Sequence, residues 1–506
     1  MESARRGPAA PAALVVPLAL SAWVYFPITR AYFWADDFVC LASIRNDGFL
    51  RFVLRPFGGH NLLLRNLVFY LSYRLFGLRA ELYFWTVLLT HLLNVFLLFR
   101  LLRNLTASLT LASFGATLWG TSPVGYGALG WYAVYGQVLA TTLVLVVLVQ
   151  LTGLAAEGRR LTARTAAVWY GLLLLATVSF GVGIGVALVF PAILFLVLPA
   201  AWRERRVRLA YLALPLVTLA AYLAFRHVYP LLAPLPPEEG TMETVVRDSL
   251  PILLPIIREL VAFSIAATLR SFYFVRRTYP DPASGVAIGA FALGCVVLLW
   301  RGDAAARRAG IAMAVLCAAV YAVIAAGRAI FFDPKVALSK TVGQLRYHYL
   351  GALPIVVLTC LALREVGRIG PLRALPRPLL LAVVLVIGGY GYAQSTFRIY
   401  DNMFCRIYID AAMRGIEGEA LAHPAGSTVY LDNGNPPAGL LGPVMLKRDF
   451  PARAAVLLLH QSGDEVNGRR VRFIERDPAV LAWYAQRQDT PLARLLVAPD
   501  AAGQQR

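Results

Sequence analysis

Two adjacent carboxylates, Asp36 and Asp37, follow the aromatic run at 32–34, just beyond the first apolar stretch of the chain. A carboxylate at a membrane edge must stay hydrated, bind a cation or take up a proton, so such a pair is costly to place. One carboxylate can act as a general base toward a hydroxyl, and two together can bind a divalent cation. The structural alternative is a pair of hydrated loop carboxylates or caps of a following helix. We take Asp36 and Asp37 as the predicted catalytic centre; whether a metal binds there stays open.

Cationic side chains downstream of the pair suit an anionic phosphate. Arg55 precedes the dipeptide Gly58-Gly59, and His60 and Arg65 follow it. Glycine lets the backbone approach a ligand closely, and a guanidinium offers paired donors to phosphate. A turn leading into an interfacial helix with snorkelling arginines accounts for the same composition.

A further outer segment, 122–137, combines aromatic residues with Gln137. Aromatic rings and amides are the usual means of holding a sugar, so Tyr132 and Gln137 are candidate substrate-binding residues. An aromatic belt at a membrane interface has the same composition.

The run Arg346-Tyr347-His348 precedes another apolar stretch. These side chains at a helix N-terminus are candidates for binding a lipid phosphate, with interfacial anchoring as the alternative. By contrast, His91 and Asn94 lie three residues apart inside an apolar stretch, where we expect hydrogen bonds between helices.

Composition places the whole chain in a membrane. It has 506 residues, of which 59% are hydrophobic and 15% charged, and a mean hydropathy of +0.64, which is outside the range of soluble globular proteins. The net charge of +20 comes largely from arginines in short segments between apolar runs. Membrane orientation explains these better than nucleic acid does, so we predict a lipid bilayer and no nucleic acid as partners.

The five cysteines form no CxxC motif and no Cys/His cluster, so neither a zinc site nor a disulfide framework is indicated. Cys40 and Cys405 are both expected on the outer side, and their pairing stays open.

A membrane-spanning helix needs about 20 mostly apolar residues. The sequence predicts about eleven such helices, at 11–29, 82–99, 107–122, 134–152, 165–181, 183–200, 208–228, 284–300, 309–327, 348–364 and 378–396. Two further stretches, 61–78 and 251–270, either span or lie in the interface.

The distribution of arginine sets the orientation. With eleven spans, the short basic segments near residues 5, 100, 159, 203, 301 and 364 all fall on one side, which is then the cytoplasm. Counting 61–78 or 251–270 as spans would move some of these segments outside. The long outer loops are then 30–81, 229–283 and 328–347.

After residue 397 the pattern changes to short strands at 428–432, 454–459, 471–474 and 495–497 and a helix at 478–487. We therefore predict an α-helical polytopic membrane domain over 1–397 and a small soluble α/β domain over 398–506, on the outer side.

The order of several short motifs resembles the GT-C superfamily of polytopic glycosyltransferases, especially protein O-mannosyltransferase-like and aminoarabinose transferase-like bacterial enzymes. These place an acidic pair after the first span, as at Asp36-Asp37, and continue with motifs similar to those at 55–57, 75–77 and 91–94. The resemblance covers about residues 10 to 200. Departures at 125–127 and 180–183, where some relatives carry acidic residues, leave the acceptor and any metal open.

This resemblance implies a GT-C-like fold and transfer of a sugar from a polyprenyl-phosphate-linked donor to a hydroxyl on a glycan, lipid or protein. It implies that Asp36 is the base, with inversion at the anomeric carbon, and that Asp37 supports it. Arg55, Arg65 and Arg346 become candidates for neutralising the leaving lipid phosphate. The expected location is a bacterial inner membrane with the reaction on the periplasmic face.

A transporter or flippase of a lipid-linked saccharide is the alternative function. It should show acids or broken helices at the membrane midplane and two related halves, whereas this chain shows no obvious repeat and carries its acidic pair in a loop. A third reading is an inactive scaffold in which the pair is only a cap.

Overall fold

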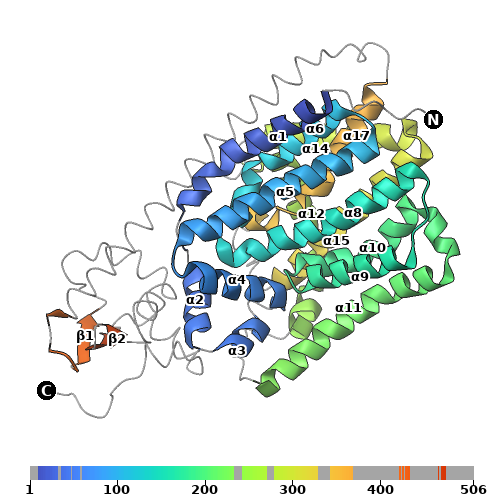
Figure 1. Cartoon of the computed structure of the whole chain (residues 1–506). Helices are drawn as coiled ribbons and strands as arrows, with labels where there is room; N and C mark the ends of the chain where they lie inside the picture. Colours follow the sequence, from blue (N-terminus) through green and yellow to red (C-terminus); the bar gives the residue numbers. More distant parts are fainter. Residues whose placement is uncertain are drawn as a thin grey trace.

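The computed structural model describes residues 9–31, 33, 36–46, 48–56, 60–232, 242–270, 279–328 and 342–368, together with 421–422, 424–426, 428–432, 465–466 and 469–474. These ranges form a bundle of long helices and one small sheet (Figure 1). The helices, with 3-10 helices marked η, are α1 (Ala9–Tyr25), η1 (Phe26–Arg30), α2 (Asp36–Asn46), α3 (Phe49–Leu54), α4 (Leu63–Phe76), α5 (Ala80–Thr106), α6 (Leu109–Gly120), η2 (Pro123–Gly125), α7 (Tyr126–Leu129), η3 (Tyr132–Val134), α8 (Tyr135–Glu157), α9 (Ala163–Thr177), α10 (Val182–Val197), η4 (Pro199–Arg203), α11 (Arg205–Leu232), α12 (Met242–Arg270), α14 (Pro282–Arg301), α15 (Ala304–Arg328), η6 (Leu345–Tyr347) and α17 (Ala352–Val366).

Within the described ranges, seven helical segments are long and apolar enough to cross a membrane: Ala13–Arg30, Ala80–Thr106, Tyr132–Glu157, Arg205–Tyr229, Ile252–Arg270, Pro282–Arg301 and Ala304–Gly327. The chain is a polytopic membrane protein, as its composition predicts. Six of these segments coincide with predicted spans. The seventh, Ile252–Arg270, is the stretch that the sequence left ambiguous.

The predicted total of eleven spans is not reached in the described part of the chain. The stretches at 107–122, 165–181, 183–200 and 348–364 form the shorter helices α6, α9, α10 and α17, and 378–396 lies outside the described residues. Each short helix begins or ends where the chain turns into irregular segments at one end of the bundle. Irregular backbone is tolerated at membrane depth when protein buries it.

Contacts between helix ends bring the basic segments near residues 100, 301 and 364 together at one end of the bundle, which we call the basic end. Asn104 donates to the Val149 carbonyl at 3.1 Å, and Arg364 donates to the Leu105 carbonyl at 3.0 Å. Arg364 also pairs with Asp303 at 3.2 Å. These contacts join the ends of α5, α8 and α17 to the turn between α14 and α15. The assignment of this end to the cytoplasm stays a prediction.

The predicted outer segment 229–283 leaves and re-enters the bundle at the opposite end, which we call the site end. The Tyr229 hydroxyl at the end of α11 donates to the Arg51 carbonyl at 3.4 Å. At the start of α14, Asp281 pairs with Arg270 at 2.6 Å. The end of α11 and the start of α14 thus lie at the site end, and the segments that join them to α12, 233–241 and 271–278, lie outside the described residues.

The α4 helix covers the ambiguous stretch 61–78 and has 14 residues, fewer than a span needs. Its polar residues do not all face outward, because it buries Arg65, Asn66 and Ser72 together with Phe69. The alternative interpretation, a snorkelling Arg65, therefore does not hold for this side chain. In Figure 1, α2, α3 and α4 lie together at one end of the long helices, and they form much of the site end.

Inside the bundle, His91 and Asn94 hold helices together, as the sequence predicts. The two His91 ring nitrogens lie 2.9 Å from the Tyr349 hydroxyl and from the Gly120 carbonyl oxygen. Asn94 donates to the Val138 carbonyl at 3.1 Å. These bonds join α5 to α6, α8 and the segment before α17.

The sheet consists of β1 (Thr428–Asp432), β2 (Glu465–Val466) and β3 (Arg469–Ile474), in the order β1-β3-β2. The β1 strand pairs in parallel with β3, and β2 pairs antiparallel with it. The strands predicted at 428–432 and 471–474 are confirmed. Those at 454–459 and 495–497 and the helix at 478–487 lie outside the described residues, so the α/β domain stays a prediction.

Candidate active site

Asp36 and Asp37 are the first two residues of α2, with different exposure. Asp37 is fully buried, whereas Asp36 is partly exposed. The Asp37 Oδ1 atom accepts the backbone N–H of Ala133, next to the start of α8, at 2.5 Å. This bond offsets part of the cost of burying a carboxylate, and the unsatisfied N–H groups of a helix start favour negative charge. Asp37 is thereby fixed in place, and Asp36 is the more accessible of the two.

A buried guanidinium lies beside the pair. Arg65 is 1% exposed and donates to the Cys40 Sγ atom in α2 at 2.9 Å. Burial raises the pKa of the Cys40 thiol, the Arg65 charge opposes this rise, and Asp36 and Asp37 add to it. Cys40 lies one helical turn after Asp36 and Asp37 on α2, so its contact with Arg65 brings that guanidinium beside the acidic pair. Arg65 is a counter-charge inside the protein and does not lie on its lipid-facing surface.

The first turn of α8 approaches this cluster closely. A Cβ atom on Gly136 would collide with the Ser179 carbonyl oxygen and would lie 3.1 Å from the Arg65 side chain. Gly136 therefore allows α8, α4 and the loop after α9 to meet. The neighbouring Gln137 is 1% exposed, and no described residue donates a hydrogen bond to its Oε1 atom, so this oxygen can accept one.

Tyr132 is a buried residue that positions a neighbouring segment. Its hydroxyl lies 2.8 Å from the Ser72 hydroxyl of α4, and its ring stacks on Tyr135 with centroids 5.1 Å apart. The side chain is 1% exposed. Tyr132 therefore holds the short helix η3 against α4, next to the amide that Asp37 accepts.

Arg55 and His60 lie at the edges of the cluster. Arg55 donates to the Ser43 hydroxyl of α2 at 2.8 Å, and its carbonyl accepts from Asn66 at 2.9 Å. The His60 ring packs against Phe180 with centroids 5.2 Å apart, and a Cβ atom on Gly181 would meet it at 2.5 Å. Each of these two residues contacts a segment that forms part of the site. No hydrogen bond between Arg55 and His60 is seen among the described residues.

Arg346 lies on η6 and reaches the same loop from the other side. Its Cζ atom is 5.2 Å from the ring centroids of both Trp131 and Tyr347. A Cβ atom on Gly127 would overlap the backbone of residues 345 and 346, so η6 packs directly on α7. Among the described residues, no carboxylate lies within ion-pair distance of Arg346.

His348 differs from its two neighbours. Its ring nitrogens lie 2.7 Å from the Val342 carbonyl oxygen and 3.0 Å from the Tyr321 hydroxyl. The side chain is completely buried. Because both nitrogens are used within the protein, we place His348 among the positioning residues.

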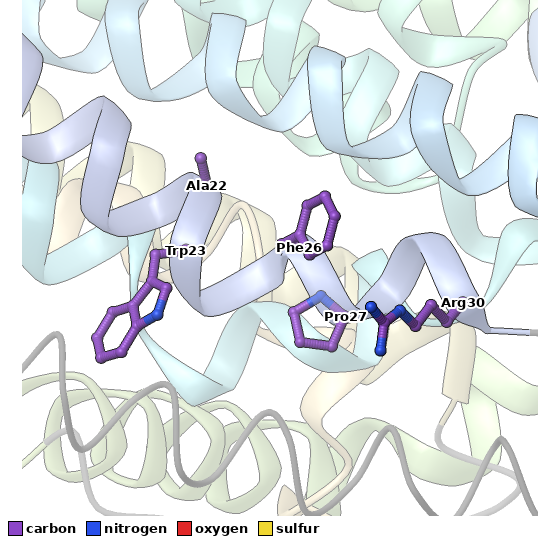
Figure 2. Close-up of a pocket in the computed structure, with 5 residues that line it drawn as sticks. All are labelled: Ala22, Trp23, Phe26, Pro27 and Arg30. Carbon is purple, nitrogen blue, oxygen red and sulfur yellow. The ribbon is translucent and has the colours of Figure 1, made fainter.

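A separate depression of about 310 Å³ lies on the side of α1 and η1, lined by Ala22, Trp23, Phe26, Pro27 and Arg30 (Figure 2). Trp23 is 46% exposed and Phe26 is 44% exposed. Its apolar lining and single cation suit a lipid chain and headgroup. None of these lining residues is a carboxylate.

Three features of the site have no simple sequence signal. The Ala133 amide acts through the backbone, and the close approaches at Gly127 and Gly136 depend on helices that meet only in the fold. The Cys40 thiol is the fourth member of the charged cluster, although spacing gave no reason to place it there.

In the described part of the chain, no group of three or more His, Cys, Asp or Glu residues is arranged to hold a metal ion.

No protein-family model and no curated protein matches the chain. Among solved structures it is similar to the crystal structure of ArnT from Cupriavidus metallidurans bound to undecaprenyl phosphate, at 13% identity and a TM-score of 0.49, with 95% of this chain and 88% of that chain covered. The apo state of the same protein gives 15% identity and a TM-score of 0.44, with 95% and 89% covered. Likenesses at this level do not assign a fold or an activity, so the functional proposal is based on this chain's own residues and contacts.

Proposed function

We propose that this protein is a membrane glycosyltransferase that moves a sugar from a polyprenyl-phosphate-linked donor to a hydroxyl acceptor at the site end. The observation that carries the proposal is the unequal acidic pair. Asp37 is buried and fixed by the Ala133 amide, while Asp36, one residue earlier in α2, is partly exposed. One carboxylate thus reaches the surface of the site, and the other is fixed inside the protein.

In this proposal Asp36 removes the proton of the acceptor hydroxyl as the acceptor oxygen attacks the anomeric carbon. The bond between that carbon and the phosphate oxygen breaks, and its electron pair leaves with the lipid phosphate. Attack from the face opposite the leaving group inverts the anomeric configuration. The proton on Asp36 then passes to water, which restores the base.

The charges of the site are divided accordingly. Arg65 is buried beside the acidic pair and offsets part of its negative charge. Arg346 pairs with no described carboxylate and is partly exposed, so it is available for the negative charge that develops on the leaving phosphate. Two arginines that the sequence treats alike therefore take different roles in the proposal.

The membrane setting fits a lipid-linked donor. The helices around the site are apolar enough to span a bilayer, and the depression at Ala22–Arg30 offers an apolar wall ending in a cation. The motif order at 36–37, 55–57, 75–77 and 91–94 resembles the GT-C superfamily and supports the same donor class. We place the protein in a bacterial inner membrane, with the site end facing the periplasm; glycan, lipid and protein acceptors stay open.

The proposal is tested by comparing the glycan profile of a strain lacking the protein with strains complemented by the wild type, Asp36→Asn or Asp37→Asn. We expect a missing sugar in the deletion strain, restored by the wild type and not by Asp36→Asn. Normal glycans in the Asp36→Asn strain would contradict the proposal. If Asp36→Asn instead abolishes movement of lipid-linked saccharide across vesicles while purified protein transfers no sugar, the transporter alternative is correct.

A further inference from the structure

Two N–H donors next to each other lack acceptors at the site end. The Nε1 atom of Trp131 and the Nε atom of Arg346 are shielded from solvent, and no described residue accepts a hydrogen bond from either. The Arg346 guanidinium lies over the Trp131 ring, with its Cζ atom 5.2 Å from the ring centroid. Burying a donor without an acceptor is costly, and native proteins rarely leave such groups unpaired. Two adjacent ones indicate an acceptor that comes from outside the chain.

The Arg346 guanidinium lies near two aromatic rings. Its Cζ atom lies 5.2 Å from the centroids of both the Trp131 and the Tyr347 rings. A cation–π contact leaves the charge of the guanidinium in place, so its N–H groups can still donate to an anion. The one described bond at this edge, from Arg346 Nη2 to the Tyr347 hydroxyl, is long at 3.4 Å. Arg346 is thus held in place without being neutralised.

The loop that carries Trp131 also holds the acidic pair. Ala133, two residues later, donates its N–H to Asp37. Two residues of extended chain span at most about 7 Å. The backbone of Trp131 therefore lies close to the amide that binds Asp37, so one short segment carries both the unpaired indole and the contact that holds the acidic pair. Gly127 allows η6 to rest on α7 and fixes the position of Arg346 relative to this loop.

We propose that Trp131 is a substrate-binding residue, whose indole N–H and Arg346 together bind the phosphate of the lipid-linked donor. This assignment rests on the proposed function and adds a residue to it. A phosphate group presents several oxygens, so it can meet the edge of a guanidinium and a neighbouring indole N–H at once. Trp131 has two tasks: its ring holds Arg346 in position, and its N–H binds an oxygen directly.

The two tasks can be separated by substitution. Trp131→Phe keeps an aromatic face and removes the N–H, whereas Trp131→Ala removes both. Arg346→Lys keeps the charge and removes the paired donors. The matched control is the pair Trp300 and Arg301 at the basic end, where the Arg301 Cζ atom lies 4.5 Å from the Trp300 ring centroid. Trp300→Phe and Arg301→Lys change the same side-chain types far from the site.

Binding is measured on the purified full-length protein in nanodiscs, with undecaprenyl phosphate, uncharged undecaprenol, phosphatidylglycerol and inorganic phosphate as separate probes. We expect Trp131→Phe and Arg346→Lys each to weaken undecaprenyl phosphate binding about tenfold or more, because a hydrogen bond to a charged group is lost. Trp131→Ala should weaken it further. Undecaprenol should bind weakly and equally to all variants, and both control variants should bind undecaprenyl phosphate as the wild type does.

The inference is overturned if Trp131→Phe and Arg346→Lys, with unfolding temperatures equal to the wild type, bind undecaprenyl phosphate unchanged. It is also overturned if phosphatidylglycerol or inorganic phosphate binds as tightly with the same dependence on Trp131. Asp36→Asn serves to separate the two proposals, because it should keep full phosphate binding. Sugar transfer by Asp36→Asn at the wild-type rate would refute the proposed function and leave the phosphate site standing.

Discussion

Asp37 Oδ1 accepts the backbone N–H of Ala133 at 2.5 Å, which ties the start of α2 to the segment that leads into α8. The two residues are far apart in the sequence, and the bond joins the first acidic segment to the loop that also carries Trp131. Asp37 thus holds these two segments together through its side-chain oxygen. Replacing it with residues that keep or lose the acceptor oxygen tests this role.

Asp37→Asn should fold nearly as well as the wild type, because the amide oxygen can still accept the Ala133 N–H. Asp37→Ala leaves that buried N–H without an acceptor, which costs about 1–3 kcal/mol of unfolding free energy. Unfolding temperatures in detergent measure the difference. Equal temperatures for the two variants would show that the bond does not hold the loop.

Gly136→Ala should reduce both stability and activity. The added Cβ would collide with the Ser179 carbonyl oxygen and press on Arg65, and overpacking of this kind costs about 1–3 kcal/mol. Gly171→Ala is the matched control, since no atom lies within 4 Å of its added Cβ. That control should be neutral or more stable by about 0.5–1 kcal/mol, because alanine favours the helix. A Gly136→Ala protein as stable and active as Gly171→Ala would refute the close approach.

Cys40 should resist alkylation in the folded protein. It is 3% exposed, and burial raises its pKa above the ordinary 9.0. Since the thiolate is the reactive form, the thiol stays neutral and unreactive through pH 8. The stability linked to this raised pKa is complete below pH 9.0 and is lost as the pH rises through the folded-state value. Mass spectrometry after maleimide treatment at pH 8, before and after denaturation, measures this, and rapid native labelling would contradict the buried cluster.

Asp303 should make the basic end sensitive to acid. Its pKa is lowered, first by the Ala306 backbone N–H, which donates at 2.7 Å, and also by Arg364. A lowered pKa contributes stability that is present above the ordinary value of 3.8 and is lost as the pH falls through the folded-state value. The unfolding temperature of the wild type should therefore drop more steeply than that of Asp303→Asn below pH 4. Parallel curves would show that Asp303 contributes nothing there.

The sequence predicted the membrane class, the grouping of basic segments and the interhelical role of His91 and Asn94. These features follow directly from long apolar stretches, from the positions of the arginines and from polar residues inside apolar stretches. It did not predict helix lengths at the site end, because α6, α9, α10 and α17 give way there to irregular segments whose backbone is buried by other parts of the chain. Apolar composition continues through such segments and cannot mark where a helix stops.

The site was predicted in part for a related reason. Asp36, Asp37 and Arg65 come together, but composition could not distinguish a snorkelling Arg65 from a buried one, and the difference depends on which face of α4 meets α2 and α8. The sequence did not distinguish His348 from its neighbour Arg346 as a candidate for binding phosphate. In the structure both ring nitrogens of His348 contact groups of the protein itself. The Ala133 amide gives no sequence signal, because every residue except proline carries a backbone N–H.

The most direct test of the proposed chemistry is the single-turnover rate of sugar transfer by purified Asp36→Asn in nanodiscs loaded with a polyprenyl-phosphate-linked sugar. Loss of a general base slows such a step about 10²–10⁴-fold. We predict a loss of this size, with unchanged unfolding temperature and unchanged binding of undecaprenyl phosphate. Transfer by Asp36→Asn at the wild-type rate would contradict the assignment of Asp36 as the base.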